Sequence, residues 1–152
     1  MKHGVDIKKV NYEGETPLYI SCQNGYLDIV KYLVEHRADI NKESNNGSTL
    51  LIEACFGENL NLIKYLIENG LDIYKENKYG YIPLYSACQE GNITIVKYLV
   101  ELGVDINKEN SYGYTQLFIA YQGGHITVVK YLVEHGADIN KESNNGCTPL
   151  FS

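Results

Sequence analysis

The sequence lacks the features of a membrane or secreted protein. None of its apolar runs approaches the ~20 residues that a membrane-spanning helix needs. The first residues, Met1 to Asp6, have no apolar core of the kind that defines a signal peptide. We therefore expect an intracellular, cytoplasmic protein that does not contact the membrane.

The chain also lacks an excess of positive charge. It has 13 Lys and Arg against 19 Asp and Glu, which gives a net charge of -6. The lysines are spread along the chain, whereas a protein that binds DNA or RNA gathers basic residues to meet phosphates. The composition therefore argues against a nucleic-acid partner and weakly favours a neutral or basic protein partner.

The sequence contains no catalytic or metal-binding motif. Gly-x-Ser-x-Gly, a phosphate-binding Gly-Lys-Ser/Thr loop and His-Glu-x-x-His are all missing. His3, His36 and His135 occur at equivalent positions in the pattern described below, and a helix end explains them without a ligand role. We expect neither catalysis nor a bound metal or cofactor.

The chain has four cysteines, and three of them are regularly spaced. Cys22, Cys55 and Cys88 follow one another at intervals of 33 residues. Stacked helices lie about 8–10 Å apart, which is too far for a disulfide, so we expect these three to be buried free thiols. Cys147 falls in a predicted turn and should be the accessible thiol.

What the chain does have is a repeat. Thr-Pro-Leu-Tyr at 16–19 has counterparts at 49–52, 82–85, 115–118 and 148–151, a period of 33 residues without a slip. Such a period indicates an array of stacked units. We predict one domain over 1–152, with the tail of a preceding repeat at 1–15, full repeats at 16–48, 49–81, 82–114 and 115–147, and the start of a truncated repeat at 148–152.

One unit predicts two short helices and a loop. Thr16 can cap a helix that Pro17 begins, and Gly25 can end it. A second helix from Leu27 to about His36 has apolar residues at helical spacing. The Asn-Gly pair at 46–47 then predicts a tight turn. The fold is therefore expected to be all-α.

These motifs are similar to those of ankyrin repeats. The resemblance rests on the period, on Thr-Pro-Leu at 16–18, on Ile-Val-Lys-Tyr-Leu-Val-Glu at 29–35 and on Gly-Ala-Asp-Ile-Asn at 136–140. It implies an α-solenoid of helix-turn-helix units with β-turn, hairpin-like loops. It also implies a protein that binds other proteins through its loop tips and first-helix face, without catalysis.

Two residues depart from the repeated pattern. Arg37 stands where the other units have glycine, and Glu58 follows a glycine that has shifted by one position. If both residues take a left-handed conformation, each loses on the order of 1 kcal/mol relative to glycine. We therefore predict that Arg37→Gly and Glu58→Gly each stabilise the fold.

Two charged patterns recur with the period. One aspartate per unit, from Asp6 to Asp138, is expected to hydrogen-bond within its loop. Lys31 and Glu35 lie four residues apart on a helix and can pair. We interpret the lysine and glutamate rows as a solvated helix face, with electrostatic steering of a partner as the alternative.

The candidate binding residues are those that differ between units. Neighbouring turn tips carry tyrosines, which give large contact areas in binding sites, although the same rings can pack on one another to support the loops. The ends of the first helices also vary. The candidates are Tyr79, Tyr81, Tyr112 and Tyr114 at the tips, with Phe56, Gln89 and Gln122 at the helix ends.

The sequence thus predicts a scaffold that binds a protein partner through its concave face and loop tips. Terminal repeats with a polar outer face, which solenoids normally need, are not apparent. The chain is therefore expected to be a segment of a longer array or multidomain protein, or to self-associate end to end. The alternatives for function are a structural spacer or homotypic assembly segment, and a module that regulates another domain of the same protein.

Overall fold

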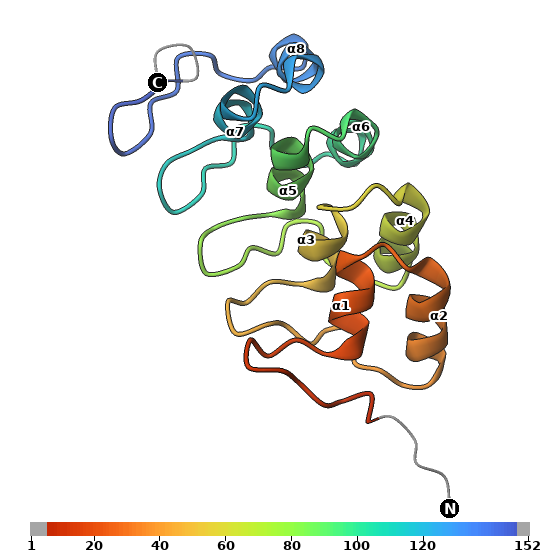
Figure 1. Cartoon of the computed structure of the whole chain (residues 1–152). Coiled ribbons are helices and arrows are strands. Elements are labelled where there is room, and N and C mark those ends of the chain that lie inside the picture. The colour runs from red at the N-terminus through yellow and green to blue at the C-terminus, as the bar shows by residue number, and fades with distance from the viewer. Residues whose placement is uncertain (1–5, 149–152) are drawn as a thin grey trace, which may run out of the picture.

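Residues 6–148 are described by a computed structural model, in which they form eight α-helices and no strand. The helices follow one another in four pairs (Figure 1). The pairs are α1 (Pro17–Gln23) with α2 (Leu27–Glu35), α3 (Leu50–Ala54) with α4 (Leu60–Glu68), α5 (Pro83–Glu90) with α6 (Ile93–Glu101), and α7 (Gln116–Gln122) with α8 (Ile126–Glu134). The predicted all-α solenoid is confirmed.

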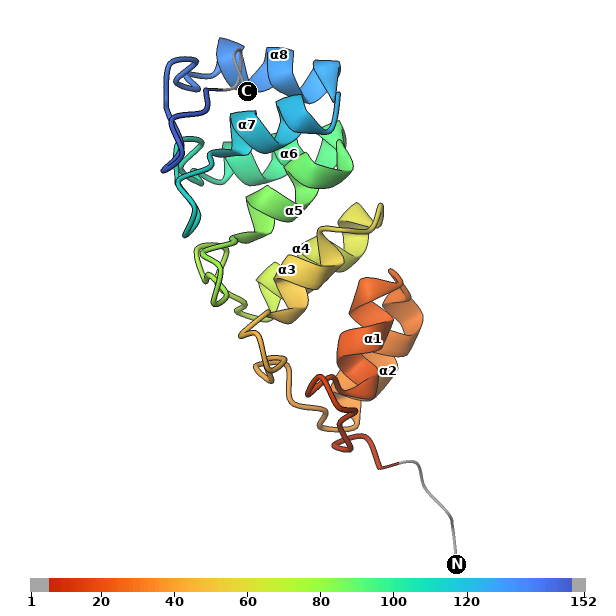
Figure 2. The same ribbon diagram turned by 60° about the vertical axis from the view of Figure 1, so that its left-hand side comes forward.

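The pairs stack in two rows. The first helices α1, α3, α5 and α7 contact one another in succession, and each packs on its own second helix. The loops that join one pair to the next project together on one side of the first helices (Figures 1 and 2). We call the surface formed by the first helices and these loops the concave face.

Capping residues explain where the first helices begin. The side-chain oxygens of Thr16, Thr49 and Thr115 accept hydrogen bonds from backbone N–H groups in the first turns of α1, α3 and α7. Pro17 and Pro83 stand at the start of α1 and α5, where the absence of an N–H costs nothing. The sequence signals for these starts are therefore confirmed.

One apolar core runs through all four pairs. Its repeated members include Leu18, Leu51, Leu84 and Leu117, none more than 2% exposed. Because helices of five to nine residues are not stable alone, this shared core holds the array together. Cys22, Cys55 and Cys88 lie in it as free thiols, as predicted, and Cys147 is partly exposed.

Side chains at the turns between paired helices tie neighbouring units together. The amide of Asn59 caps α4 and donates a hydrogen bond to the carbonyl of Gly25, 3.0 Å away. The ring Nε2 of His125 lies 2.8 Å from the carbonyl oxygen of Gln89. His125 therefore has a structural contact between two units.

Arg37 has the left-handed conformation that the sequence predicted. Its φ is 66°, and it is the one non-glycine residue with positive φ in the described part of the chain. Glu58 does not have a positive φ, so the prediction that Glu58→Gly relieves a left-handed conformation was wrong. Helix α3 ends early, at Ala54, and the chain passes through Gly57 and Glu58 to α4 without a left-handed residue.

The aspartates act within their loops, as predicted. Oδ1 of Asp39, for example, accepts a hydrogen bond from the N–H of Asn41 at 2.9 Å. Equivalent bonds form at the four other aspartates of the series.

Lys31 and Glu35 do not form the ion pair that their spacing allows. Lys31 instead places its Nζ 5.6 Å from the centre of the Tyr65 ring on the next second helix. Lys64 and Lys97 repeat this cation–π contact one and two units further on. The ion pairs of the described residues join consecutive loops: Glu43 with Lys75, Glu76 with Lys108, and Glu109 with Lys141.

Candidate protein-interaction surface

The four tip tyrosines divide into two kinds. Tyr81 stacks on Tyr85 with ring centres 3.9 Å apart, and Tyr114 stacks on Phe118 at 4.3 Å. Both rings are half-buried and join a small aromatic cluster at the base of the loops. Tyr81 and Tyr114 therefore support the loops, and they do so through rings of α5 and α7 rather than through the tyrosines of a neighbouring tip.

The other two tip tyrosines are available to solvent. Tyr79 is 39% exposed and Tyr112 is 49% exposed, and each leans on the supporting tyrosine of its own tip. The ring centres of Tyr79 and Tyr81 are 5.7 Å apart. Each of these two tips therefore presents one exposed tyrosine ring that packs against a second, half-buried ring.

Short-range hydrogen bonds fix the shape of each tip. The side-chain oxygen of Asn77 accepts bonds from the N–H groups of Tyr79 and Tyr81, at 2.9 and 3.1 Å. Asn110 does the same in the next tip. At Gly80, φ is 74° and a Cβ would lie 2.9 Å from the backbone nitrogen of Ser111, so glycine is needed there.

The tips are also bonded to one another through the main chain. The N–H of Lys78 donates to the carbonyl of Asn46 at 2.9 Å, and the N–H of Ser111 donates to the carbonyl of Tyr79 at 2.9 Å. Equivalent bonds join Asn45 to Glu13 and Asn144 to Tyr112. The four bonds form what we call the tip ladder.

The remaining predicted site residues are dispersed. Phe56, just after α3, is half-buried and lines a pocket together with Tyr79 and Tyr81. Gln89 and Gln122 are exposed near the ends of α5 and α7, and neither lines that pocket. The structure thus brings three of the seven candidates into one pocket.

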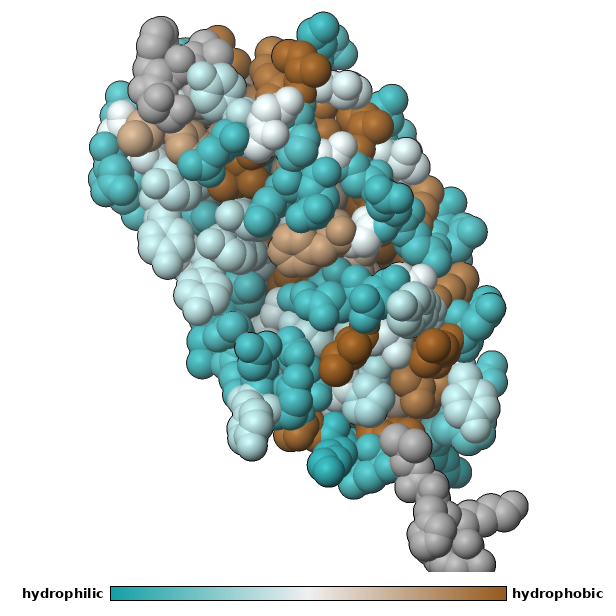
Figure 3. Space-filling view, viewed as in Figure 1, coloured by the Kyte–Doolittle hydropathy of each residue, from teal (hydrophilic) through white to brown (hydrophobic). Residues whose placement is uncertain are grey.

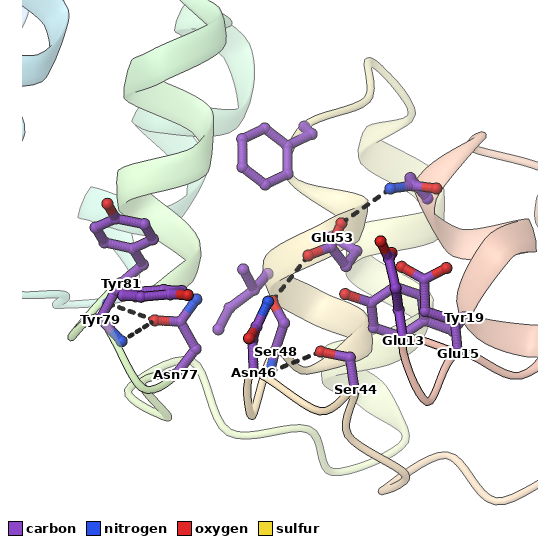
Figure 4. Close-up of a pocket in the computed structure, with 13 residues that line it drawn as sticks. Glu13, Glu15, Tyr19, Ser44, Asn46, Ser48, Glu53, Asn77, Tyr79 and Tyr81 are labelled. Atoms are coloured by element: carbon purple, nitrogen blue, oxygen red, sulfur yellow. Dashed lines mark hydrogen bonds between the residues drawn. The ribbon is translucent and has the colours of Figure 1, made fainter. Parts of the chain in front are cut away.

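That pocket, which we call the Glu53 pocket, has a volume of about 250 Å³ on the concave face. Figure 4 shows Glu53 between two groups of side chains, with Tyr79 and Tyr81 on one side and Glu13, Glu15 and Tyr19 on the other. The sequence reasoning missed these three glutamates. A comparison between units could have found Glu53, because its counterparts are Ile20, Ser86 and Ile119.

Burial shifts the ionisation of several groups around the concave face. Burial, and then a hydrogen bond with Glu53, raises the pKa of Tyr19 above its ordinary value. Burial likewise raises the pKa of Tyr85, and that of the Cys22 thiol to about 12. Burial also raises the pKa of the Cys55 and Cys88 thiols. These hydroxyls and thiols stay protonated at neutral pH, so none of them is poised as a nucleophile.

The surface around the tips is mostly hydrophilic. In the view of Figure 3, hydrophobic residues are scattered among hydrophilic ones.

Within residues 6–148, no three His, Cys, Asp or Glu side chains lie close enough together to hold a metal ion. None of the helices described is long and apolar enough to cross a membrane. The rings of His36 and His135 stack on Tyr32 and Tyr131, respectively, in the second-helix row.

Comparison with protein families gives one consistent result. A model described as ankyrin repeats (3 copies) matches residues 37–110 and 102–152. A model described as ankyrin repeats (many copies) matches residues 2–54. A search of curated proteins finds no match to the chain.

Proposed function

Because the chain belongs to the ankyrin-repeat family, we propose that it is a non-catalytic module that binds a protein partner on its concave face and tip loops. Ankyrin repeats are generally protein–protein interaction modules, and stacked units create the extended surface that such contacts use. We propose that residues 1–152 act as one domain with the repeat boundaries given above. The four free cysteines favour a reducing, cytoplasmic setting.

The observation that carries this proposal is the pair of exposed tyrosines on adjacent tips. Tyr79 and Tyr112 are held in fixed positions, since the main chain of Tyr79 accepts a hydrogen bond from Ser111 in the next tip. A tyrosine ring that is already oriented gives a large contact area with little loss of conformational entropy. Both rings are therefore suited to act as binding hot spots.

The test is capture of partners from a lysate of the source organism, with quantification by mass spectrometry. The bait is the wild-type chain beside a Tyr79→Ala/Tyr112→Ala double variant, in which the supporting rings of Tyr81 and Tyr114 are kept. Tyr74→Ala is the matched control, because Tyr74 is 58% exposed and lies in the turn after α4 rather than at a tip. Circular dichroism of all three chains checks the helical content.

The expected result is a protein that is retained by the wild type and by Tyr74→Ala and is lost with the double variant. Loss of two hot-spot rings costs roughly 2 kcal/mol or more each, which is at least a 30-fold weakening for each ring. Equal recovery of every captured protein by the wild type and the double variant would refute a binding role for these tips.

A second function, self-association, is favoured by apolar side chains on α8. Ile126 is 61% exposed and Val133 is 43% exposed, whereas Leu60 and Ile93, which correspond to Ile126, are half-buried. If this face joins copies of the chain, sedimentation velocity will show assembly that grows with concentration and is abolished by Ile126→Lys. If the chain is a monomer at all concentrations, self-association is refuted and partner binding is the one function that remains.

A further inference from the structure

Glu53, in the middle of α3, is a buried carboxylate without a cation. It is 8% exposed, and charged residues are rarely buried to this extent unless they are paired. Its Oε1 accepts a hydrogen bond from Oγ of Ser48 at 2.8 Å, and its Oε2 accepts a long one, 3.4 Å, from Gln23. The hydroxyl of Tyr19 is a third, uncharged neighbour of this carboxylate. No lysine or arginine of the described residues forms an ion pair with it.

The rest of the Glu53 pocket adds negative charge and aromatic surface. Glu13 is exposed and Glu15 is half-buried on the loop that precedes α1, while Tyr79 and Tyr81 supply rings from the opposite side (Figure 4). Phe56 also lines the pocket. No lysine or arginine is among the residues that line the pocket. The pocket therefore combines three carboxylates with aromatic rings and has no cation of its own.

The size and chemistry of the pocket narrow the choice of occupant. Its volume, about 250 Å³, is below the roughly 300–1,000 Å³ of pockets that hold drug-sized ligands, so one side chain is a better match. A metal ion does not fit, since the carboxylates are not gathered closely enough within the described residues. A guanidinium group fits both the carboxylates and the aromatic rings of the pocket, because it bonds carboxylates through a planar fork and stacks on aromatic faces. An ammonium group is a more strongly hydrated point charge and lacks both properties.

We propose that the Glu53 pocket receives an arginine side chain from an extended segment of the partner protein. Glu53 binds the guanidinium group at the inner end of the pocket, and the rings beside it pack against the guanidinium plane. This inference rests on the proposed function, which it deepens by naming the partner's chemistry. The net charge of -6 favours the approach of such a basic segment.

The test is a titration of the ¹⁵N-labelled chain, followed by NMR, with N-acetyl-L-arginine methylamide as the probe. We expect the probe to shift the amide signals of Glu53, Ser48 and Tyr79, with saturation in the millimolar range. The citrulline counterpart has the same shape without the charge and should produce no saturable shift. The lysine counterpart should bind at least about threefold more weakly, because it lacks the planar fork.

Two variants that each remove one negative charge test whether the arginine probe binds at Glu53. Glu53→Gln keeps an oxygen that can accept the bond from Ser48, and it should weaken arginine binding at least tenfold, as expected for a lost hydrogen bond to a charged group. Glu68→Gln removes an exposed charge at the end of α4, outside the pocket, and should leave binding unchanged. Retention of the dispersed amide spectrum shows that each variant is folded.

Several results would overturn this proposal. They are an equal response to citrulline, an equal response to lysine, shifts elsewhere on the chain only, or equal weakening by both glutamine variants. If Glu53→Gln failed to fold, the comparison of arginine with citrulline on the wild type would still decide. Loss of the captured partner from the Tyr79/Tyr112 variant, with no response to arginine, would refute the arginine pocket and leave the proposed function standing.

Discussion

Replacement of Arg37 by glycine isolates the energetic effect of one backbone conformation. Arg37 follows α2 with φ of 66°, and it takes part in no ion pair within residues 6–148. Gly70, Gly103 and Gly136 occupy the same place in the later units, with φ of 92°, 95° and 98°. The arginine has therefore settled closer to the left-handed well near about +57° that a residue with a Cβ tolerates.

The expected gain is the difference between two opposing terms. A left-handed conformation costs a residue with a Cβ roughly 1–2 kcal/mol. Glycine loses about 0.5–1 kcal/mol more conformational entropy on folding than other residues do. Arg37→Gly should therefore raise the free energy of unfolding by about 0.5–1 kcal/mol. For a chain of this length, that corresponds to a rise of about 1–4 °C in Tm.

Thermal and urea unfolding, both followed by circular dichroism at 222 nm, will measure this gain. Arg37→Ala is the matched control, because it removes the same side chain and keeps the strained backbone, and its stability should equal that of the wild type. A rise of the same size in both variants would show that the arginine side chain, rather than its φ, is responsible. No rise in either would refute the reasoning from backbone conformation.

Three further predictions follow from the packing. The free energy of unfolding should fall as pH rises above about 8.5, by up to ~1.4 kcal/mol per pH unit for each of the buried thiols of Cys22, Cys55 and Cys88. The reason is that these thiols ionise in the unfolded chain and stay protonated in the fold, and urea titrations at pH 7.5 to 10 measure the effect. Iodoacetamide should label Cys147 first in the native protein, as read by mass spectrometry. Gly80→Ala should lower the unfolding free energy by roughly 2–3 kcal/mol and Gly70→Ala by roughly 1, because a Cβ would meet backbone atoms at Gly80 and open space at Gly70. Equal losses in urea melts would contradict this.

Periodicity made most of the fold predictable. Each unit repeats the same caps, glycines and apolar stripe, so a pattern read in residues 16–48 could be checked against the units that follow. The left-handed Arg37 was predictable for the same reason, because three glycines mark the conformation of that position. The error at Glu58 arose where the period is locally broken: α3 stops at Ala54, and the turn after it no longer follows the other units.

The site was only partly predictable, because contacts across units decide it. A tyrosine at a tip looks the same in sequence whether it faces solvent or stacks on a ring below, as Tyr79 and Tyr81 do respectively. Lys31 could reach Glu35 on its own helix, yet it lies over a ring of the next one. Residues that are close in sequence gave predictions about single helices, whereas the partners on neighbouring units depend on the stacking geometry.

The tip ladder bears on how the concave face binds. Each tip is joined by a main-chain hydrogen bond to the tip before it, so Tyr79 cannot move far without displacing Ser111 and the loop that carries Tyr112. The ion pairs between loops are exposed and contribute little, about 0–1 kcal/mol each, so the ladder and the packed rings of Tyr81 and Tyr114 are the main restraints. A partner that contacts adjacent tips therefore meets rings whose positions are already set. Because the entropy of ordering loops is among the larger costs of association, this arrangement lets a few exposed side chains contribute most of their contact energy to affinity.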